Sequence, residues 1–337
     1  MQKNVLSILI IVLIGILALP NISSAISVTT GTTYSLINEL GVETNPTYPK
    51  PNENVTISLT MYTEDLNSSK IEWYQNDKLV LQGQGETQYS FKIGAAGEET
   101  KIKIVVTLAS GTSFSKSFTL NPTDVEIVWE ADSYVPPFYK GKALHPKQGV
   151  LKLVAIPQFV SNGKKIAPEN LIYKWSNDYS VYQDQSGYGK NVITINGSLL
   201  GKNESINVLV TDPSSNMSAE GFVDIPTVNP EIVFYENSPY YGYLFDSAIT
   251  NIFNLKSEEV QILAAPFFFT NETDSILNYV WQLNNQILPD LSNSRTAIFK
   301  KPEESGQSKI SLEVTNENKI LQQADTNLIM NFTNEEE

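Results

Sequence analysis

One segment occurs three times in this chain: an aromatic-rich stretch with a single central tryptophan, followed by a polar turn. The tryptophans are Trp73, Trp175 and Trp281, and successive copies lie about one hundred residues apart. A period near one hundred residues is the size of one β-sandwich domain. The repeat therefore predicts three successive sandwich modules, each with its tryptophan in the core.

Each tryptophan segment is flanked by two stretches in which apolar residues alternate with other residues. This period-two pattern is typical of a strand with one buried face. No long stretch with helical periodicity follows the first 25 residues, so the pattern predicts an all-β fold. The flanking stretches are residues 55–59, 151–156 and 260–265 before the tryptophans and 102–107, 206–211 and 310–315 after them.

The N-terminus has the pattern of an export signal. Lys3 precedes an apolar run over residues 5–19, which Pro20 interrupts ahead of Ser23 and Ala25. Small residues at these two positions match a signal peptidase site, and the run is shorter than the roughly 20 residues that span a bilayer. We expect a signal peptide over residues 1–25; an uncleaved N-terminal anchor is the alternative. No later segment reaches transmembrane length, and the expected location is extracellular, at the cell surface or in the envelope.

The complete prediction is a tandem array of three immunoglobulin-like β-sandwich modules after an N-terminal signal peptide. Short proline-bearing joints near Pro122 and Pro226 separate the modules and predict a semi-rigid rod. The expected divisions are the signal peptide over 1–25, the modules over 26–122, 123–226 and 227–333, and an acidic tail over 334–337.

Composition limits the partners and the chemistry. The formal net charge is −14, which argues against nucleic acid as a partner. The chain has no cysteine, so disulfides and thiol chemistry are excluded. The single histidine, His145, lies in a proline-bearing stretch and is interpreted as a surface-loop residue. With neither a second histidine nor a nucleophile motif, we expect no enzyme, no cofactor and no metal site.

Calcium at the module joints is the metal alternative, because extracellular sandwich arrays can be stiffened by oxygen ligands there. The acidic residues near the first joint are Asp124, Glu126, Glu130 and Asp132. Asp212 and Asn216 lie in a further turn. No Asp-x-Asp-x-Asp loop is present, so solvated charges are the favoured interpretation.

The most distinctive local feature is an aromatic segment that occurs in modules two and three. Exposed aromatic rings offer a large contact area at small conformational cost, and they can bind a protein or a sugar face. Two copies at equivalent positions also fit a structural role at the end of each sandwich, which is the favoured alternative. The candidate partner-binding residues are Tyr134, Phe138, Tyr139, Tyr240, Tyr243 and Phe245.

The strand with Trp and Asn, followed by a glycine-bearing turn and a valine-rich strand, resembles bacterial Ig-like (PKD-like) repeat proteins of the cell surface. The PKD motif Trp-Asp-Phe-Gly-Asp-Gly itself is absent. Residues 134–143 and 185–191 are similar to segments of an uncharacterised exported family in Candidate Phyla (Patescibacteria) bacteria. This resemblance implies an Ig-like fold and export, and no activity.

The sequence thus favours a non-enzymatic, exported cell-surface or envelope protein. It would present Ig-like modules as a spacer or adhesive rod that contacts an unidentified protein or glycan. The alternative is a structural subunit of an envelope or pilus-like assembly, whose edge strands pair with other subunits. The oligomeric state is not determined by the sequence.

Overall fold

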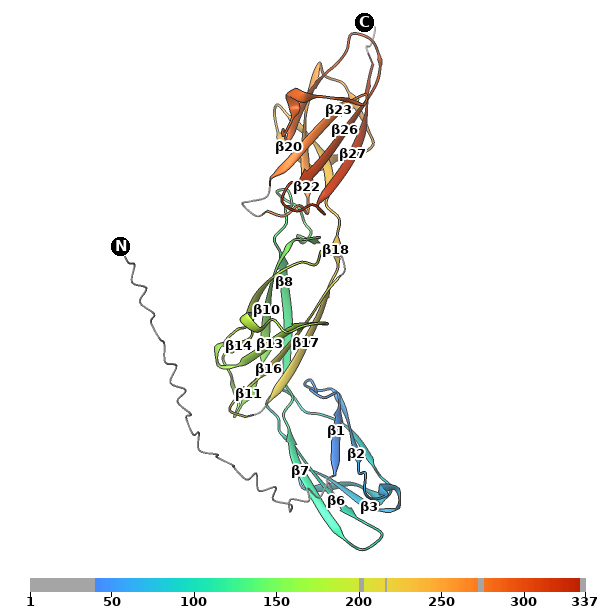
Figure 1. The fold of residues 1–337 in the computed structure, drawn as a ribbon, viewed down its shortest axis with the longest axis vertical. Coiled ribbons are helices and arrows are strands. Elements are labelled where there is room, and N and C mark those ends of the chain that lie inside the picture. The colour runs from blue at the N-terminus through green and yellow to red at the C-terminus, as the bar shows by residue number, and fades with distance from the viewer. Residues whose placement is uncertain (1–39, 200–202, 216, 272–275, 334–337) are drawn as a thin grey trace, which may run out of the picture.

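The computed structural model describes residues 40–199, 203–215, 217–271 and 276–333. Three β-sandwich modules follow one another along the long axis of an extended molecule (Figure 1). The predicted signal peptide and acidic tail lie outside the described residues. Within the described ranges, no helix has the length and apolar character needed to cross a membrane. The all-β tandem architecture predicted from the tryptophan repeat is confirmed.

Module one packs a three-stranded sheet against a four-stranded sheet, and every pairing is antiparallel. Alternation along the strands directs residues such as Ile57 and Ile104 into a core around Trp73. The strands of the first sheet are β1 (Gly41–Asn45), β2 (Asn54–Thr60) and β5 (Gln88–Lys92). Those of the second are β3 (Lys70–Gln75), β4 (Lys78–Gln84), β6 (Thr100–Thr107) and β7 (Ser113–Leu120).

Module two repeats this arrangement around Trp175. One sheet contains β8 (Asp124–Ala131), β10 (Val150–Gln158) and β15 (Val192–Asn196). The other contains β13 (Ile172–Asn177), β14 (Gly187–Tyr188), β16 (Glu204–Thr211) and β17 (Ser218–Ile225). Two short ribbons accompany these sheets. β11 (Val160–Ser161) pairs with β12 (Lys164–Lys165), and β9 (His145–Pro146) pairs in parallel with β18 (Thr227–Val228), which directly follows module two in the chain.

Module three is built around Trp281 and has the longest strands. Its first sheet contains β19 (Glu231–Ser238), β20 (Gly242–Ile249), β22 (Glu259–Phe267) and β25 (Thr296–Lys300). Its second contains β21 (Ile252–Leu255), β23 (Leu277–Leu283), β24 (Gln286–Ile287), β26 (Gly306–Asn316) and β27 (Gln323–Phe332). Single 3₁₀ turns at Leu66–Ser68, Pro168–Asn170, Gln183–Gln185 and Pro289–Leu291 are the helical elements of the described chain.

The three repeated tryptophans are fully buried, as the sequence predicts. Each indole N–H donates a 2.8 Å hydrogen bond to a backbone carbonyl, of Glu86, Lys190 and Ser294 respectively. A buried N–H without a partner would be costly, so this bond makes the large ring compatible with the core. Because this indole-to-carbonyl hydrogen bond occurs in all three modules, it explains why the repeated core residue is tryptophan.

The asparagine after the tryptophan has a structural role in modules one and three. Asn76 and Asn284 have φ near +49° and open tight hairpins, a conformation that asparagine tolerates well. The side chain of each accepts a hydrogen bond from a backbone N–H of the strand beside it, that of Lys101 at 2.9 Å and that of Lys309 at 2.8 Å. The Trp-x-x-Asn signature therefore encodes a core residue and the turn that follows it.

Candidate functional site: the junction of modules two and three

The segment that leaves β8 of module two crosses over to module three instead of staying on its own sandwich. Ser133 forms a β-bridge with Thr270, which follows β22. The Tyr134 N–H donates to the carbonyl of Phe269 at 2.7 Å, and the Phe268 N–H donates to the carbonyl of Tyr134 at 2.8 Å. Backbone pairing thus extends the sheet structure across the boundary between the two modules.

An apolar cluster fills this boundary. Its buried members, Tyr235, Ala265, Phe267 and Phe268, all belong to module three. Residues of module two and of β18 cover them. The apolar surface that is thereby removed from water stabilises the contact between the modules. The half-buried residues packed against the buried members are Tyr134, Val135, Leu144, Val228, Val233 and Phe245. We call the buried and half-buried residues together the junction cluster.

Polar contacts surround the junction cluster. The fully buried Gln322 side chain donates to the Lys147 carbonyl and to the Thr270 hydroxyl, both at 2.7 Å. Its amide oxygen accepts from the Thr270 backbone and from Asn316, both at 3.1 Å. The Leu321 N–H donates to the Gln148 side chain at 2.8 Å. Because all these polar groups are satisfied, modules two and three meet in one defined arrangement.

A surface pocket of about 660 Å³ opens beside the junction cluster. Module two contributes a loop, and module three contributes β20. The residues from module two are Phe138, Tyr139, Lys140 and Gly141, and those from module three are Tyr241, Tyr243, Leu244, Phe245 and Asp246. We call this the aromatic pocket. It exists only where the two modules meet.

The loop side of the aromatic pocket is held by one ring. Tyr139 stands edge-on to Phe267, with ring centroids 5.4 Å apart. Its ring also lies against Gly141, where an added Cβ would come within 2.5 Å of the Tyr139 side chain. A side chain at position 141 would therefore displace the Tyr139 ring from its present place. The preceding Phe138 has φ +65°, a left-handed conformation rarely adopted by a bulky residue, and its side chain is 90% exposed.

The β20 side of the aromatic pocket is shaped by an irregularity in pairing. The register between β19 and β20 shifts, so that the stretch 244–247 lies opposite Glu236 alone. Such a bulge bends the strand and re-aims its side chains. Phe245 packs on Tyr235 of the junction cluster with centroids 5.2 Å apart, and Tyr243 lies 5.9 Å from Phe245. Tyr241 is 84% exposed at the neighbouring turn.

Of the six aromatic residues that the sequence predicts as partner-binding candidates, the structure places some in the aromatic pocket and others outside it. Phe138, Tyr139, Tyr243 and Phe245 line the aromatic pocket together. Tyr240 is highly exposed but does not line it, and Tyr134 is half buried between the modules. The sequence predicts two equivalent copies of one segment, whereas the two copies meet at a single site. Tyr241 also lines the pocket, and its place beside Tyr240 in the same aromatic segment is the sequence signal for it.

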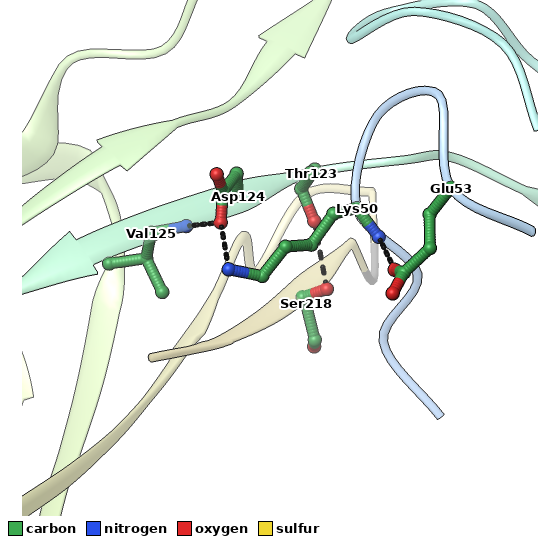
Figure 2. A network of polar contacts seen from close by, with 6 residues as sticks. All are labelled: Lys50, Glu53, Thr123, Asp124, Val125 and Ser218. Carbon is green, nitrogen blue, oxygen red and sulfur yellow. Dashed lines mark hydrogen bonds and ion pairs between the residues drawn. The ribbon is translucent and has the colours of Figure 1, made fainter. Parts of the chain in front are cut away.

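The junction of modules one and two contains a solvent-exposed ion pair. Figure 2 shows its polar contacts: Lys50 Nζ lies 3.0 Å from Asp124 Oδ1, and the Lys50 N–H donates to Glu53 at 2.8 Å. Asp124 also accepts from the Val125 N–H, and nearby the Thr123 hydroxyl donates to the Ser218 carbonyl at 2.8 Å. The ion pair is solvent-exposed, and none of the buried hydrophobic clusters of the described chain spans this junction.

The acidic residues considered for calcium do not gather. Within the described residues, no three Asp, Glu, His or Cys side chains are placed to hold a metal ion. Asp124 is paired with Lys50. Asp212 is buried, which raises its pKa, but hydrogen bonds from Ser215 and Ser214 outweigh this and keep the pKa of the carboxyl below its ordinary value. Asn216 lies outside the described residues.

His145 is not a surface residue, and the prediction from its loop-like sequence was wrong. It is fully buried in β9, and its Nε2 lies 4.0 Å from a carboxylate oxygen of Glu204 on β16. Parallel pairing with β18 covers this strand, an interaction between distant segments that local sequence does not reveal. Burial raises the pKa of Glu204, but His145 and the Ser198 N–H outweigh this and hold it below its ordinary value.

No protein-family model matches the chain, and no curated protein is significantly similar in sequence. Similar solved structures include the three N-terminal domains of the bacteriophage RB49 Highly Immunogenic Outer Capsid protein (Hoc). The identity to Hoc is 12% and the TM-score is 0.27, and the match covers 88% of this chain and 99% of that one. The central fibronectin-III array of RIM-binding protein has 10% identity, 88% and 97% coverage and a TM-score of 0.32. A 1.5-MDa bacterial ice-binding adhesin has 9% identity, 88% and 98% coverage and a TM-score of 0.23. TM-scores of this size imply no shared function.

Proposed function

We propose that this protein is a non-enzymatic, exported component of the cell surface or envelope. It presents three Ig-like modules, assigned to residues 26–122, 123–226 and 227–333, as a rod that contacts a protein or glycan. The signal-like pattern of residues 1–25 and the resemblance to exported Ig-like repeat proteins support export. The extended arrangement of the modules supports a spacer role (Figure 1).

The observation that carries the proposal is the convergence of two aromatic segments in one surface pocket. Residues more than one hundred positions apart in the sequence, Phe138 and Tyr241, are both highly exposed there. Exposed aromatic rings beside a defined hollow are typical of recognition sites, because water is readily displaced from them by a complementary surface. The rings of the junction cluster hold the modules together, while these outer rings remain available for contact.

A non-catalytic role also agrees with the placement of the one histidine. His145 is fully buried and faces Glu204, where a substrate does not reach it. The aromatic pocket contains one carboxylate, Asp246, and one amine, Lys140, rather than the two carboxylates that glycoside hydrolysis requires. Binding without turnover is therefore the function that this arrangement supports.

Brief protease treatment of intact native cells, followed by fractionation and blotting, tests the display of the rod. We expect the chain to remain with the cells and to be removed by the protease. Recovery only from the medium, or complete protection inside the cell, would contradict surface display. A periplasmic marker protein serves as the control for cell integrity.

A second candidate, a subunit of an envelope or pilus-like assembly, is favoured by a different feature. A pocket with mainly apolar lining residues is formed near the end of β27. That end of β27 lies at the tip of module three farthest from module two (Figure 1). Leu283, Leu288, Met330 and Phe332 are among the lining residues of this pocket. An assembly subunit would self-associate through such an end. Sedimentation of the purified chain over a range of concentrations distinguishes the candidates, because a rod that binds an external ligand stays monomeric.

A further inference from the structure

We propose that the aromatic pocket binds an uncharged oligosaccharide, with the exposed rings of Phe138 and Tyr241 as its stacking surfaces. This inference rests on the proposed function and specifies the ligand class of the same site. Both side chains belong to the pocket lining, and they come from different modules. The ligand would therefore contact modules two and three simultaneously.

The shape of the site favours a small ligand over a folded protein. A stable protein interface removes about 800 Å² from each partner and is usually extended, whereas small-ligand sites are hollows of roughly 300–1,000 Å³. The aromatic pocket, at about 660 Å³, lies within the second range. An oligosaccharide of a few sugar rings matches a hollow of this size that is open to solvent.

The ring chemistry favours a sugar over other small ligands. A pyranose with equatorial hydroxyls has an apolar face of axial C–H groups, which packs against the negative face of an aromatic ring. Its rim carries hydroxyls that donate and accept hydrogen bonds. Tyr139, Tyr241 and Tyr243 combine an aromatic face with a phenolic hydroxyl, so they match both parts of the sugar.

The charges of the aromatic pocket favour a neutral sugar. Asp246 offers two acceptor oxygens to sugar hydroxyls, and Lys140 offers donors. These two formal charges cancel locally, while the chain as a whole carries −14. A ligand with several carboxylates or phosphates would be repelled by this field, because only one lysine of the lining opposes it.

The inner part of the site is formed before any ligand arrives. Tyr139 is fixed by Phe267 and by the close approach of Gly141, and Phe245 is fixed by Tyr235. Phe138 adopts its left-handed backbone although its exposed side chain makes little contact to favour it. Strained conformations at exposed positions are characteristic of functional sites. A floor of fixed rings lowers part of the ordering cost of binding, which suits a ligand with few strong contacts.

Isothermal titration of the full chain with cellotetraose and chitotetraose tests the inference, with tetragalacturonic acid as the charged comparison. We expect at least one neutral tetrasaccharide to bind and the acidic one to bind more weakly. Phe138→Ala and Tyr241→Ala should each weaken binding by about ten-fold or more, as expected for stacking anchors at a contact. Asp246→Asn should weaken it less, because an amide oxygen still accepts a hydrogen bond.

Tyr179→Ala is the matched control, since Tyr179 is as exposed as Tyr241 but lies in module two outside the lining. It should leave affinity unchanged, and all variants should keep the wild-type melting curve. Failure of both neutral sugars to bind, preference for the acidic one, or unchanged affinity in the Phe138 and Tyr241 variants would overturn the inference. A displayed chain that captures a protein through these residues, but no sugar, would leave the proposed function standing and overturn only the carbohydrate assignment.

Discussion

The guanidinium of Arg295 lies over the ring of Tyr134, with its Cζ 4.5 Å from the ring centroid, and it donates a hydrogen bond to the Tyr134 hydroxyl. Arg295 is the only arginine in the chain. It belongs to module three and Tyr134 to the connection from module two, so this pair joins the modules beside the junction cluster. The Arg295 Nε–H also donates to the Ala264 carbonyl at 3.2 Å, which fixes the direction of the guanidinium.

Arg295→Lys should therefore loosen the second junction even though the charge is kept. Lysine lacks the planar fork that both stacks on the ring and donates to two acceptors. We expect the free energy of unfolding of this module pair to fall by about 1–3 kcal/mol. Chemical denaturation measures it. Lys300→Arg, an exposed change on β25 of the same module, is the control and should be neutral.

Lys50→Ala should have a much smaller effect on stability and a larger one on shape. The Lys50–Asp124 pair is 3.0 Å long, with side chains 54% and 30% exposed, and exposed pairs contribute about 0–1 kcal/mol. Small-angle X-ray scattering should show a broader range of angles between modules one and two. Unchanged scattering profiles in both the variant and high salt would show that other contacts set this angle.

Trp175→Ala should be among the most damaging single changes. The side chain is fully buried, and its loss leaves a cavity and an unpaired Lys190 carbonyl. The expected loss is about 3–5 kcal/mol, measured by denaturant unfolding. Phe222→Ala, in the same module but on the exposed face of β17, should be nearly neutral. A mild effect of the tryptophan change would contradict its role as the centre of the core.

The pKa of Glu204 lies below its ordinary value of 4.5 in the folded protein. The folded state therefore favours the ionised carboxyl, and this stabilisation is present above the unfolded pKa and is lost as pH falls through the folded one. Glu204→Gln should destabilise the protein near neutral pH, and the difference from the wild type should shrink as pH falls below the ordinary glutamate pKa and through the lower folded one. Melting temperatures across pH 3–8 measure the difference. Glu220→Gln, an exposed change on β17, should show no such convergence.

Millimolar calcium should leave the melting temperature unchanged. Asp124 is paired with Lys50, and Asp212 is bonded to Ser214 and Ser215, so neither is a ready ligand. A rise of several degrees on adding calcium, reversed by a chelator, would contradict this. Magnesium at the same concentration controls for general ionic effects.

The sequence alone determined the architecture, because the features that specify a sandwich are local and repeated. Alternation around Trp73, Trp175 and Trp281 identifies strands with one buried face, and a spacing of about one hundred residues fixes the module size. The asparagines that follow Trp73 and Trp281 indicate turns, because asparagine tolerates the positive φ that a tight hairpin requires. These features depend on residues close together in the chain, so they can be read without the fold.

Only the tertiary structure decided how the aromatic segments are used. Phe138 and Tyr241 are far apart in the sequence, and the path of one loop across a module boundary brings them to the same pocket. The burial of His145 likewise depends on β18, a strand far later in the chain that follows module two. Such contacts form between surfaces that exist only after each sandwich has folded. A site at a module junction is therefore hard to predict from local sequence, whereas the modules that form it can be predicted from the tryptophan repeat.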